Sequence, residues 1–240
     1  MLVRGMLLAL VVAAGSAIMA QSGPVNTLTP AEKAAGWRLL FDGTSLDGWR
    51  GFKAQTAPAG WKAVDGALTR VDKAGDLITA GQFTDFELRL EWKLGKPGGN
   101  SGIFFHVLEE GGDQAYFTGP EVQVLDNAGH KDGADPKTSA GSNYALHAPV
   151  RDVTKPVGEW NEVRLVVQGP HVEHWMNGVK IVEYELWSPD WEGRVTASKF
   201  GKMPGYGRAR TGHIAIQDHG DPVAFRNIKV RVLQPSSSRR

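Results

Sequence analysis

The sequence contains no cysteine among its 240 residues. Without a thiol the chain forms no disulfide, carries no lipid anchor on cysteine and has no cysteine nucleophile. Long apolar runs are also scarce, because the run at Met6–Ala14 is too short to span a bilayer. Arg4 precedes this run and small residues follow it up to Ala20, as in a secretory signal. We therefore predict a signal peptide over residues 1–20 and a periplasmic or secreted protein without a membrane anchor after cleavage.

An excess of charge of one sign is missing as well. Arg4 is the basic residue of the predicted signal, so the rest of the chain has 26 basic and 26 acidic residues. No basic run is long enough to follow a phosphate backbone, which argues against nucleic acid as a partner. The 30 glycines and 8 tryptophans instead favour tight turns and surfaces on which sugars stack. The oligomeric state is left open.

Helical periodicity is nearly absent. No stretch of twelve or more residues repeats apolar side chains every 3.6 positions, which excludes a fold with a crossover helix after each strand. One helical turn is predicted at 29–35, where Thr29 caps the first turn and Pro30 takes the first helical position. The clearest hairpin joins 171–176 to 179–185 through Asn-Gly.

Strands are predicted over most of the remaining chain. Further segments of this kind are 37–41, 61–64, 67–71, 76–79, 83–93, 102–108, 120–125, 143–146, 160–168, 212–217 and 223–233. About a dozen strands without an internal linker predict an all-β fold in which two antiparallel sheets pack as a jelly-roll sandwich. The domain is expected over 36–233, after a lead-in at 21–35 and before a frayed tail at 234–240.

Polar side chains alternate along the segment 121–127, Glu-Val-Gln-Val-Leu-Asp-Asn. In an extended strand Glu121 and Gln123 share one face, and a small bulge would turn Asp126 toward it. Such a face is typical of a solvated strand, or of a groove that binds a polyol and moves protons on it.

Other segments present candidate groups for the same groove. Gln217 and His219 share one side of the strand that ends in Gln-Asp-His-Gly, and His219 follows an apolar run at a glycine turn. The glycine-rich segment before residue 103 supplies Asn100 and leads to His106, on the face of Phe104. Tyr144 lies in a third segment, and Lys199 in a glycine-rich stretch suited to the rim of the groove.

Metal binding is left open. The loop 127–142 contains Asp132 and Asp135, whose oxygens suit a hard divalent cation, but its spacing fits neither an EF-hand nor a zinc site. The chain also lacks a Gly-x-Ser-x-Gly elbow and a phosphate-binding loop.

The ordered motifs of the chain resemble the family of 3-keto-disaccharide hydrolases. They are GWRLLFDGTSLDGW at 36–49, WKAVDGAL at 61–68, GNSGIFF at 99–105, EVQVLDN at 121–127, GEWNEVRL at 158–165 and IAIQDHGDPVAFRNIKV at 214–230. The resemblance implies a concanavalin A-like β-sandwich, an exported bacterial protein and action on glycosides oxidised to a ketone at C3.

The implied chemistry assigns roles to the candidate residues. A ketone at C3 acidifies the C2 hydrogen, so a base can remove it, the C1 oxygen can leave by elimination, and water can add to the enone. We assign His219 as base or acid with Glu121 as its partner, while Asp126 orients His219 or binds a cation. Substrate-binding roles fall to the amide, hydroxyl and basic groups of Asn100, His106, Gln123, Tyr144, Lys199 and Gln217.

Two alternatives stay open. The segment 121–127 is loosely similar to the catalytic strand of laminarinase-like glycosidases, in which two carboxylates cleave unoxidised glycans by displacement, although Gln123 replaces the middle acid. A carbohydrate-binding module without catalysis is the other alternative, with Trp187 and Trp191 as stacking residues on an exposed surface.

Overall fold

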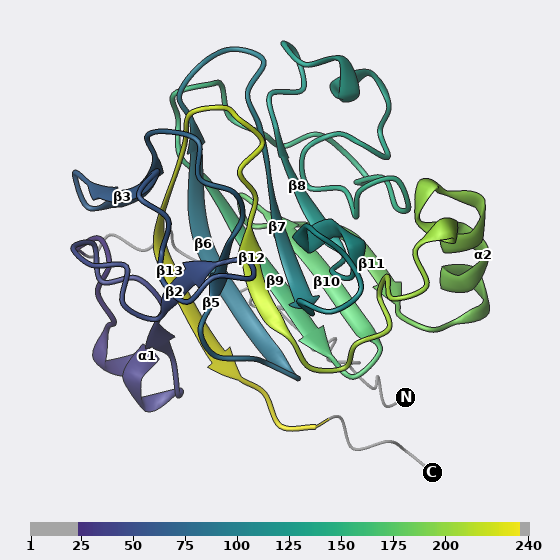
Figure 1. The fold of residues 1–240 in the computed structure, drawn as a ribbon, viewed down its shortest axis with the longest axis horizontal. Coiled ribbons are helices and arrows are strands. Elements are labelled where there is room, and N and C mark those ends of the chain that lie inside the picture. Colours follow the sequence, from purple (N-terminus) through teal and green to yellow (C-terminus); the bar gives the residue numbers. More distant parts are fainter. Residues whose placement is uncertain (1–23, 236–240) are drawn as a thin grey trace, which may run out of the picture.

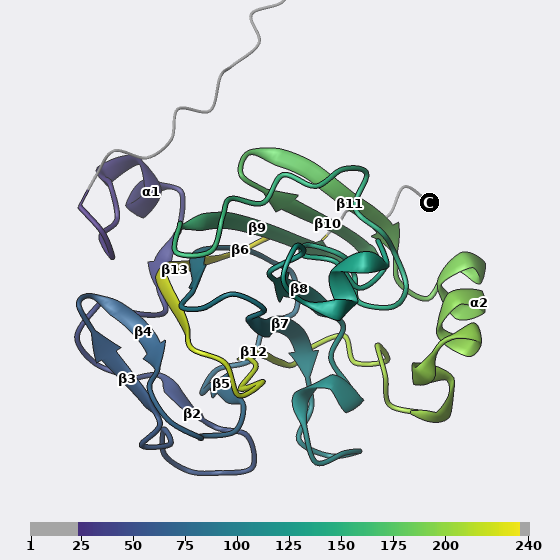
Figure 2. The same ribbon diagram turned by 90° about the horizontal axis from the view of Figure 1, so that it is seen from above.

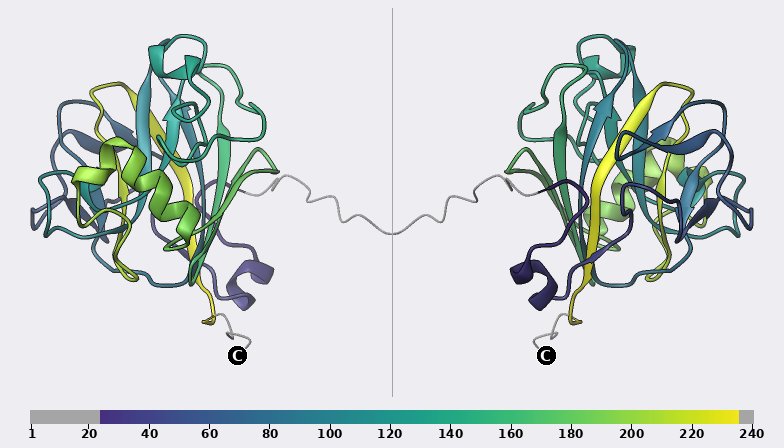
Figure 3. Two further views of the ribbon diagram at one scale, coloured as in Figure 1. Left: turned by 90° about the vertical axis from the view of Figure 1, so that its right-hand side faces the viewer. Right: turned by 90° about the vertical axis from the view of Figure 1, so that its left-hand side faces the viewer.

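The computed structural model of the protein describes residues 24–235, so the predicted signal peptide and the residues after 235 lie outside the described part. Two antiparallel sheets pack face to face as a β-sandwich (Figures 1 and 2), which confirms the predicted fold class. Helices α1 (Pro30–Ala34) and α2 (Pro189–Ala197) lie at opposite ends of the sandwich (Figure 1), so that each is in front in one of the two views of Figure 3. No described helix is long and apolar enough to cross a membrane.

The larger sheet has eight strands in the order β11-β10-β9-β6-β13-β4-β3, with β1 paired to β13 beside this path. Its strands are β1 (Arg38–Leu39), β3 (Trp61–Val64), β4 (Ala67–Arg70), β6 (Phe86–Leu94), β9 (Asn161–Gln168), β10 (His171–Met176), β11 (Val179–Glu185) and β13 (Val223–Val232). The predicted hairpin forms between β10 and β11, where Asn177 takes a positive φ of 49° before Gly178.

The smaller sheet has five strands in the order β2-β5-β12-β7-β8. Their bounds are β2 (Trp49–Gly51), β5 (Leu77–Thr79), β7 (Asn100–Val107), β8 (Glu121–Leu125) and β12 (His213–Ile216). Short 3-10 helices lie within the connecting loops of the described chain. They are η1 (Ala115–Phe117), η2 (Lys131–Ala134) and η3 (Lys199–Lys202).

Alternation along the strands decides which side chains enter the core. In β7, Ile103 and Phe105 belong to the main apolar cluster between the sheets, whereas Phe104 belongs to a second cluster on the outer face. Val122 and Val124 of β8 likewise pack into the main cluster. Glu121 and Gln123 are therefore left on the outer face of the smaller sheet, as the alternation predicts.

One of the two α-helices of the described chain was predicted from the sequence and the other was not. The predicted turn forms as α1, with a capping box between Thr29 and Glu32 and Pro30 in its first turn. The sequence analysis missed α2, which Ser188 caps by accepting a hydrogen bond from the Trp191 backbone N–H. Trp191 is fully buried, and Trp187 donates its indole N–H to the Gly207 carbonyl.

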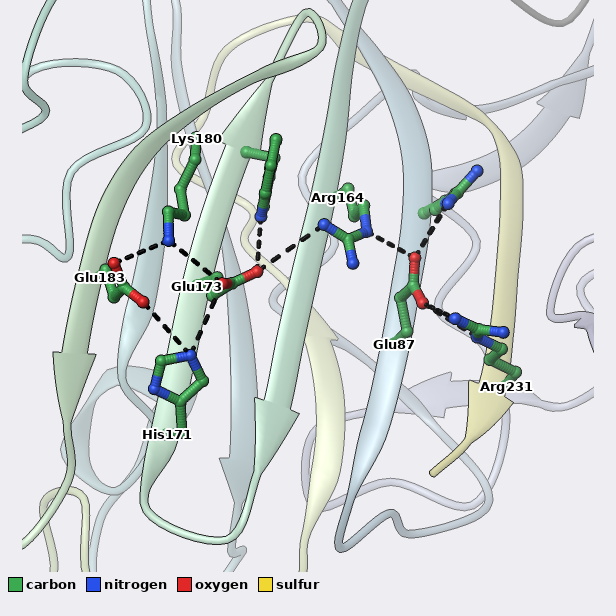
Figure 4. Close-up of polar contacts among 9 residues, drawn as sticks. Glu87, Arg164, His171, Glu173, Lys180, Glu183 and Arg231 are labelled. Atoms are coloured by element: carbon green, nitrogen blue, oxygen red, sulfur yellow. Dashed lines mark hydrogen bonds and ion pairs between the residues drawn. The ribbon is translucent and has the colours of Figure 1, made fainter. Parts of the chain in front are cut away.

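The outer face of the larger sheet carries a network of ion pairs (Figure 4). Glu87 of β6 is 1% exposed and accepts hydrogen bonds from Arg164 at 2.6 Å, Arg89 at 3.0 Å and Arg231 at 2.9 Å. Burial alone would raise the pKa of Glu87, but these guanidinium groups hold it below its usual value. One buried carboxylate is therefore the shared counter-ion of cations from three adjacent strands.

We expect Glu87→Ala to lower the free energy of unfolding by about 3 kcal/mol, because it leaves three guanidinium groups without their shared counter-ion. Urea denaturation at pH 7 measures this change. Glu183→Ala on the same face is the control, since Glu183 is about half exposed and should contribute less than about 1 kcal/mol. Equal losses in the two variants would contradict the prediction.

Candidate active site

A polar cavity of about 390 Å³ opens on the outer face of the smaller sheet. Its floor is formed by outward-facing positions of neighbouring strands, since the order β5-β12-β7-β8 brings the ends of these strands side by side. Seven of the side chains predicted for the site line this cavity: Asn100, Glu121, Gln123, Tyr144, Lys199, Gln217 and His219. The structure thus brings together residues from five separate segments of the chain.

Five further lining residues escaped the sequence analysis as members of the site: Asp76, Gln114, Tyr116, Asp132 and Asp218. Asp76 accepts backbone N–H groups from Ala115 and Asp218, each at 3.1 Å, and so ties the η1 loop to the end of β12. Burial raises the pKa of Asp76 above its ordinary value. A single acid before a short strand carries no pattern that reveals such contacts.

Two predicted site residues lie elsewhere. His106 takes a positive φ of 51° at a break in the β7–β12 register, so its ring turns away and donates Nε2–H to the Thr84 carbonyl at 2.8 Å. Asp126 accepts backbone N–H groups from Gly98 and Ala128, and it borders a different cavity beside Trp92. The bulge expected to turn Asp126 toward Gln123 is absent, because β7 and β8 pair in continuous register through Leu125.

Glu121 is held in a tight and nearly dry position. Its side chain is 5% exposed and lies against Gly102 of β7, where a Cβ atom would come within 2.1 Å of Glu121 Oε1. Only glycine at 102 leaves room for this carboxyl group. Burial raises the pKa of Glu121 to about 8, against the opposing effect of the Lys199 ammonium. Glu121 is therefore mostly a neutral acid at pH 7.

Lys199 places the cavity's ammonium group among aromatic rings. Its Nζ lies 4.3 Å from the ring centroid of Tyr144 and 5.5 Å from that of Tyr116. Desolvation lowers the pKa of Lys199, while Glu121 and Asp132 act in the opposite direction. Tyr144 in turn donates its hydroxyl to Asp132 at 3.2 Å, and burial together with this carboxylate raises the pKa of Tyr144 to about 12.

A stack of rings supports the segment that carries Lys199. The ring centroids of Tyr184 and Trp191 are 5.5 Å apart, those of Trp191 and Tyr206 6.1 Å, and those of Tyr206 and Phe200 3.8 Å, all within 12° of parallel. Phe200 follows Lys199 directly in η3. Because these rings are buried and close-packed, they fix η3 against β11 and α2.

His219 lies on the opposite lip of the cavity, about half exposed. Its Nε2 is 3.4 Å from Asn100 Nδ2, and its Nδ1 is 3.9 Å from Asp221 Oδ2. The ring also meets His130 edge-on, with centroids 6.3 Å apart. A carboxylate thus does stand beside His219, but it belongs to Asp221 and not to Asp126.

Two buried amide oxygens in the cavity have no partner among residues 24–235. They are Oδ1 of Asn100, at the start of β7, and Oε1 of Gln217, which directly follows the neighbouring strand β12. An unmade hydrogen bond at a buried acceptor costs about 1–3 kcal/mol, so a ligand that brings hydroxyl hydrogens would gain from both. This chemistry suits a sugar.

Among residues 24–235, one group of side chains has the composition and spacing of metal ligands, and it lies outside the cavity, on the outer face of the larger sheet (Figure 4). His171, Glu173 and Glu183 have ligand atoms within 4.8 Å of one another. Lys180 contacts Glu173 at 3.3 Å and Glu183 at 2.7 Å, so an ammonium group already occupies the cation's place.

Comparison with known proteins gives one family. Residues 36–231 match the 3-keto-alpha-glucoside-1,2-lyase-like domain. A 3-keto-disaccharide hydrolase of Bacteroides thetaiotaomicron is 38% identical over 231 residues, which cover 83% of this chain and 79% of that protein.

Solved structures agree with this match. The crystal structure of a candidate glycosyl hydrolase from Parabacteroides distasonis ATCC 8503 superposes with a TM-score of 0.82 at 34% identity, covering 88% of this chain and all of that one. A second candidate glycosyl hydrolase from the same organism gives a TM-score of 0.65 at 28% identity, over 82% of this chain and 99% of the other.

The buried acid at 121 predicts how stability depends on pH. Because the pKa of Glu121 is raised from 4.5 to about 8, the folded state binds more protons than the unfolded state between these values, and stability falls as pH rises through them. The Glu121→Gln variant has no ionisable group at position 121, so its stability does not fall with pH for this reason. We expect the variant to gain about 3–4 kcal/mol over the wild type between pH 5 and pH 8, measured by urea denaturation. Parallel stability curves for the two proteins would contradict the raised pKa.

Proposed function

The chain belongs to the 3-keto-alpha-glucoside-1,2-lyase-like family, and from this premise we propose that it is a glycoside hydrolase acting on 3-keto-disaccharides. The reaction begins with removal of the C2 proton, which the C3 ketone acidifies. The electron pair of that bond is delocalised onto the C3 oxygen as an enolate. The enolate then expels the C1 oxygen, so that the ketone re-forms beside a new C1–C2 double bond and the leaving oxygen takes a proton. Water then adds, with its hydroxyl on C1 and its hydrogen on C2.

One observation carries the proposal. A single cavity contains an imidazole, a mostly protonated carboxyl and an ammonium group from three separate segments. The elimination needs a base at C2, an acid at the leaving oxygen and a positive group at the C3 oxygen. We assign these roles to His219, Glu121 and Lys199 in that order.

The remaining polar groups suit substrate binding. The unpartnered oxygens of Asn100 and Gln217 would accept hydroxyl hydrogens of the sugar, and Gln123 and Tyr144 would contribute further polar contacts. Gln217 lies between Asp76 and Asn100 in the strand order, so these contacts would run across the sheet.

The laminarinase-like alternative needs a second carboxylate on β8. Asp126, the next acid along the chain, directly follows β8, but it accepts the Gly98 and Ala128 backbone N–H groups outside the cavity. Gln123 occupies the position between the two acids and is not ionisable. A displacement by a carboxylate pair on this strand therefore has less support than elimination.

The binding-module alternative rests on exposed tryptophans, and the two proposed for it are not free to stack on a sugar. Trp191 is fully buried within the ring stack, and the Trp187 indole donates to Gly207 while Arg210 lies 4.2 Å from its ring centroid.

Mass spectrometry in D₂O tests the reaction. We expect 3-keto-trehalose or 3-keto-lactose to release 3-keto-glucose with one deuterium at C2, because elimination removes the C2 proton and rehydration returns a deuteron from solvent. The unoxidised parent disaccharides should remain intact. Unlabelled product would contradict elimination, and cleavage of the parents at a similar rate would favour the displacement alternative. Product incubated alone in D₂O controls for exchange after release.

Substitution of Lys199 tests the charge at the C3 oxygen. We expect Lys199→Met to lower kcat by about 100-fold, because it removes a positive group at the developing enolate. Lys199→Arg should retain more of the rate, since it keeps the charge. Lys202→Met is the matched control in the same η3 helix, as Lys202 does not line the cavity. Steady-state kinetics on the 3-keto substrate measure the effects. An unchanged kcat in Lys199→Met would remove Lys199 from the mechanism.

A further inference from the structure

We infer that Asp221 is a positioning residue for His219 and that Lys96 moderates its effect, an assignment that rests on the function proposed above. Asp221 Oδ2 lies 3.9 Å from His219 Nδ1, and Oδ1 of the same carboxylate pairs with Lys96 Nζ at 2.7 Å. The Asp221 side chain is 17% exposed, whereas that of His219 is 45% exposed. A shielded carboxylate thus stands behind an accessible imidazole.

The loop that carries His219 is fixed by the aspartates on both sides of it. Asp218 accepts backbone N–H groups from Ala74, Gly75 and Gly220 and pairs with Arg70. Asp221 accepts the backbone N–H of Asn100 at 3.0 Å, which attaches the other end of the loop to the start of β7. His219 is therefore presented by a loop with two attached ends.

The carboxylate also selects the tautomer. At 3.9 Å Asp221 Oδ2 is too far from Nδ1 to accept a hydrogen bond, but its negative charge favours the imidazole form with hydrogen on Nδ1, the nitrogen that faces it. The lone pair is then on Nε2, the atom that faces Asn100 at the cavity. Nε2 is therefore the nitrogen that can accept the C2 proton of the substrate.

The charges around His219 also affect its role as a base. When His219 takes the C2 proton it becomes an imidazolium ion, which the Asp221 carboxylate stabilises. Lys96 neutralises part of that carboxylate's charge, and so weakens the stabilisation. The other titratable groups that face His219 are His130 on the 127–142 loop, Asp76 before β5 and the adjacent Asp218. Removal of Asp221 and removal of Lys96 should therefore have opposite effects on His219.

The first experiment measures the effects of Asp221 and Lys96 on His219 in the absence of substrate. The His219 Cε1–H resonance, identified by its loss in His219→Asn, is followed by NMR as a function of pH at low ionic strength. We expect Asp221→Asn and Lys96→Met to move the pH midpoint of this resonance in opposite directions, down in the first variant and up in the second. Lys180→Met and Glu183→Gln are the matched controls, because this pair has the same 2.7 Å separation on the other sheet.

The second experiment measures catalysis. On a 3-keto-disaccharide, Asp221→Asn should lower kcat by about 10- to 100-fold with little change in KM, and its acidic limb of the kcat/KM profile should move to lower pH. Lys96→Met should move that limb to higher pH. Asp221→Glu should restore part of the rate, because it returns the charge.

The outcomes separate the two proposals. Midpoints that stay in place, or that move in the same direction in both variants, would overturn the assignment of Asp221 and Lys96. A loss of activity in Asp221→Asn that is uniform across pH would overturn it as well, since it indicates a structural role. If the wild type fails to cleave any 3-keto-disaccharide, the proposed function fails, while the NMR arm still decides whether Asp221 and Lys96 control His219.

Discussion

The site depends above all on the backbone pairing of β8 along both of its sides. One side pairs with β7 in continuous register, and the other bonds to residues 141–144 through Gly141 N–H to Gln123, Gln123 N–H to Ser142, and Tyr144 N–H to Glu121. An edge strand normally exposes these groups to solvent or to another chain. Here they are used within the molecule, so Glu121 and Gln123 keep one orientation and Tyr144 is drawn beside them. The aromatic stack then brings Lys199 to the same place from the far end of the sandwich.

The position of Glu121 opposes folding and favours chemistry. At any pH at which a solvated carboxyl group would ionise, burial of Glu121 lowers the free energy of unfolding, and the Lys199 ammonium offsets this loss only in part. The surrounding sandwich supplies the stability from burial elsewhere, since the main apolar cluster joins both sheets. The cavity can therefore retain a neutral acid and unpartnered amide oxygens, features that a protein selected for stability alone would lose.

Much of the fold and part of the site could be predicted from local pattern. Alternation and turn residues identify strands one segment at a time, and they placed Glu121 and Gln123 on one face correctly. The failures have particular causes. The left-handed backbone at His106 breaks the alternation, and the absence of a bulge keeps Asp126 out of the cavity. The α2 helix has nine residues, too few to show a helical period, and it forms because Ser188 caps it and the core buries Trp191.

Local sequence patterns do not show which carboxylates have a structural role. Contacts between segments that are distant in the sequence determine this. Glu87 and Asp218 are both shielded from water, yet their pKa values lie below the usual range because arginine side chains or backbone N–H groups outweigh burial. Glu121 and Asp76 receive too little of this compensation, and their pKa values are raised. Asp218 and Asp76 both line the same cavity, so location alone does not separate the two kinds. The balance between desolvation and donated hydrogen bonds does, and it makes Asp218 an anchor of the loop while Glu121 stays mostly protonated at pH 7, as the acid role proposed for it requires.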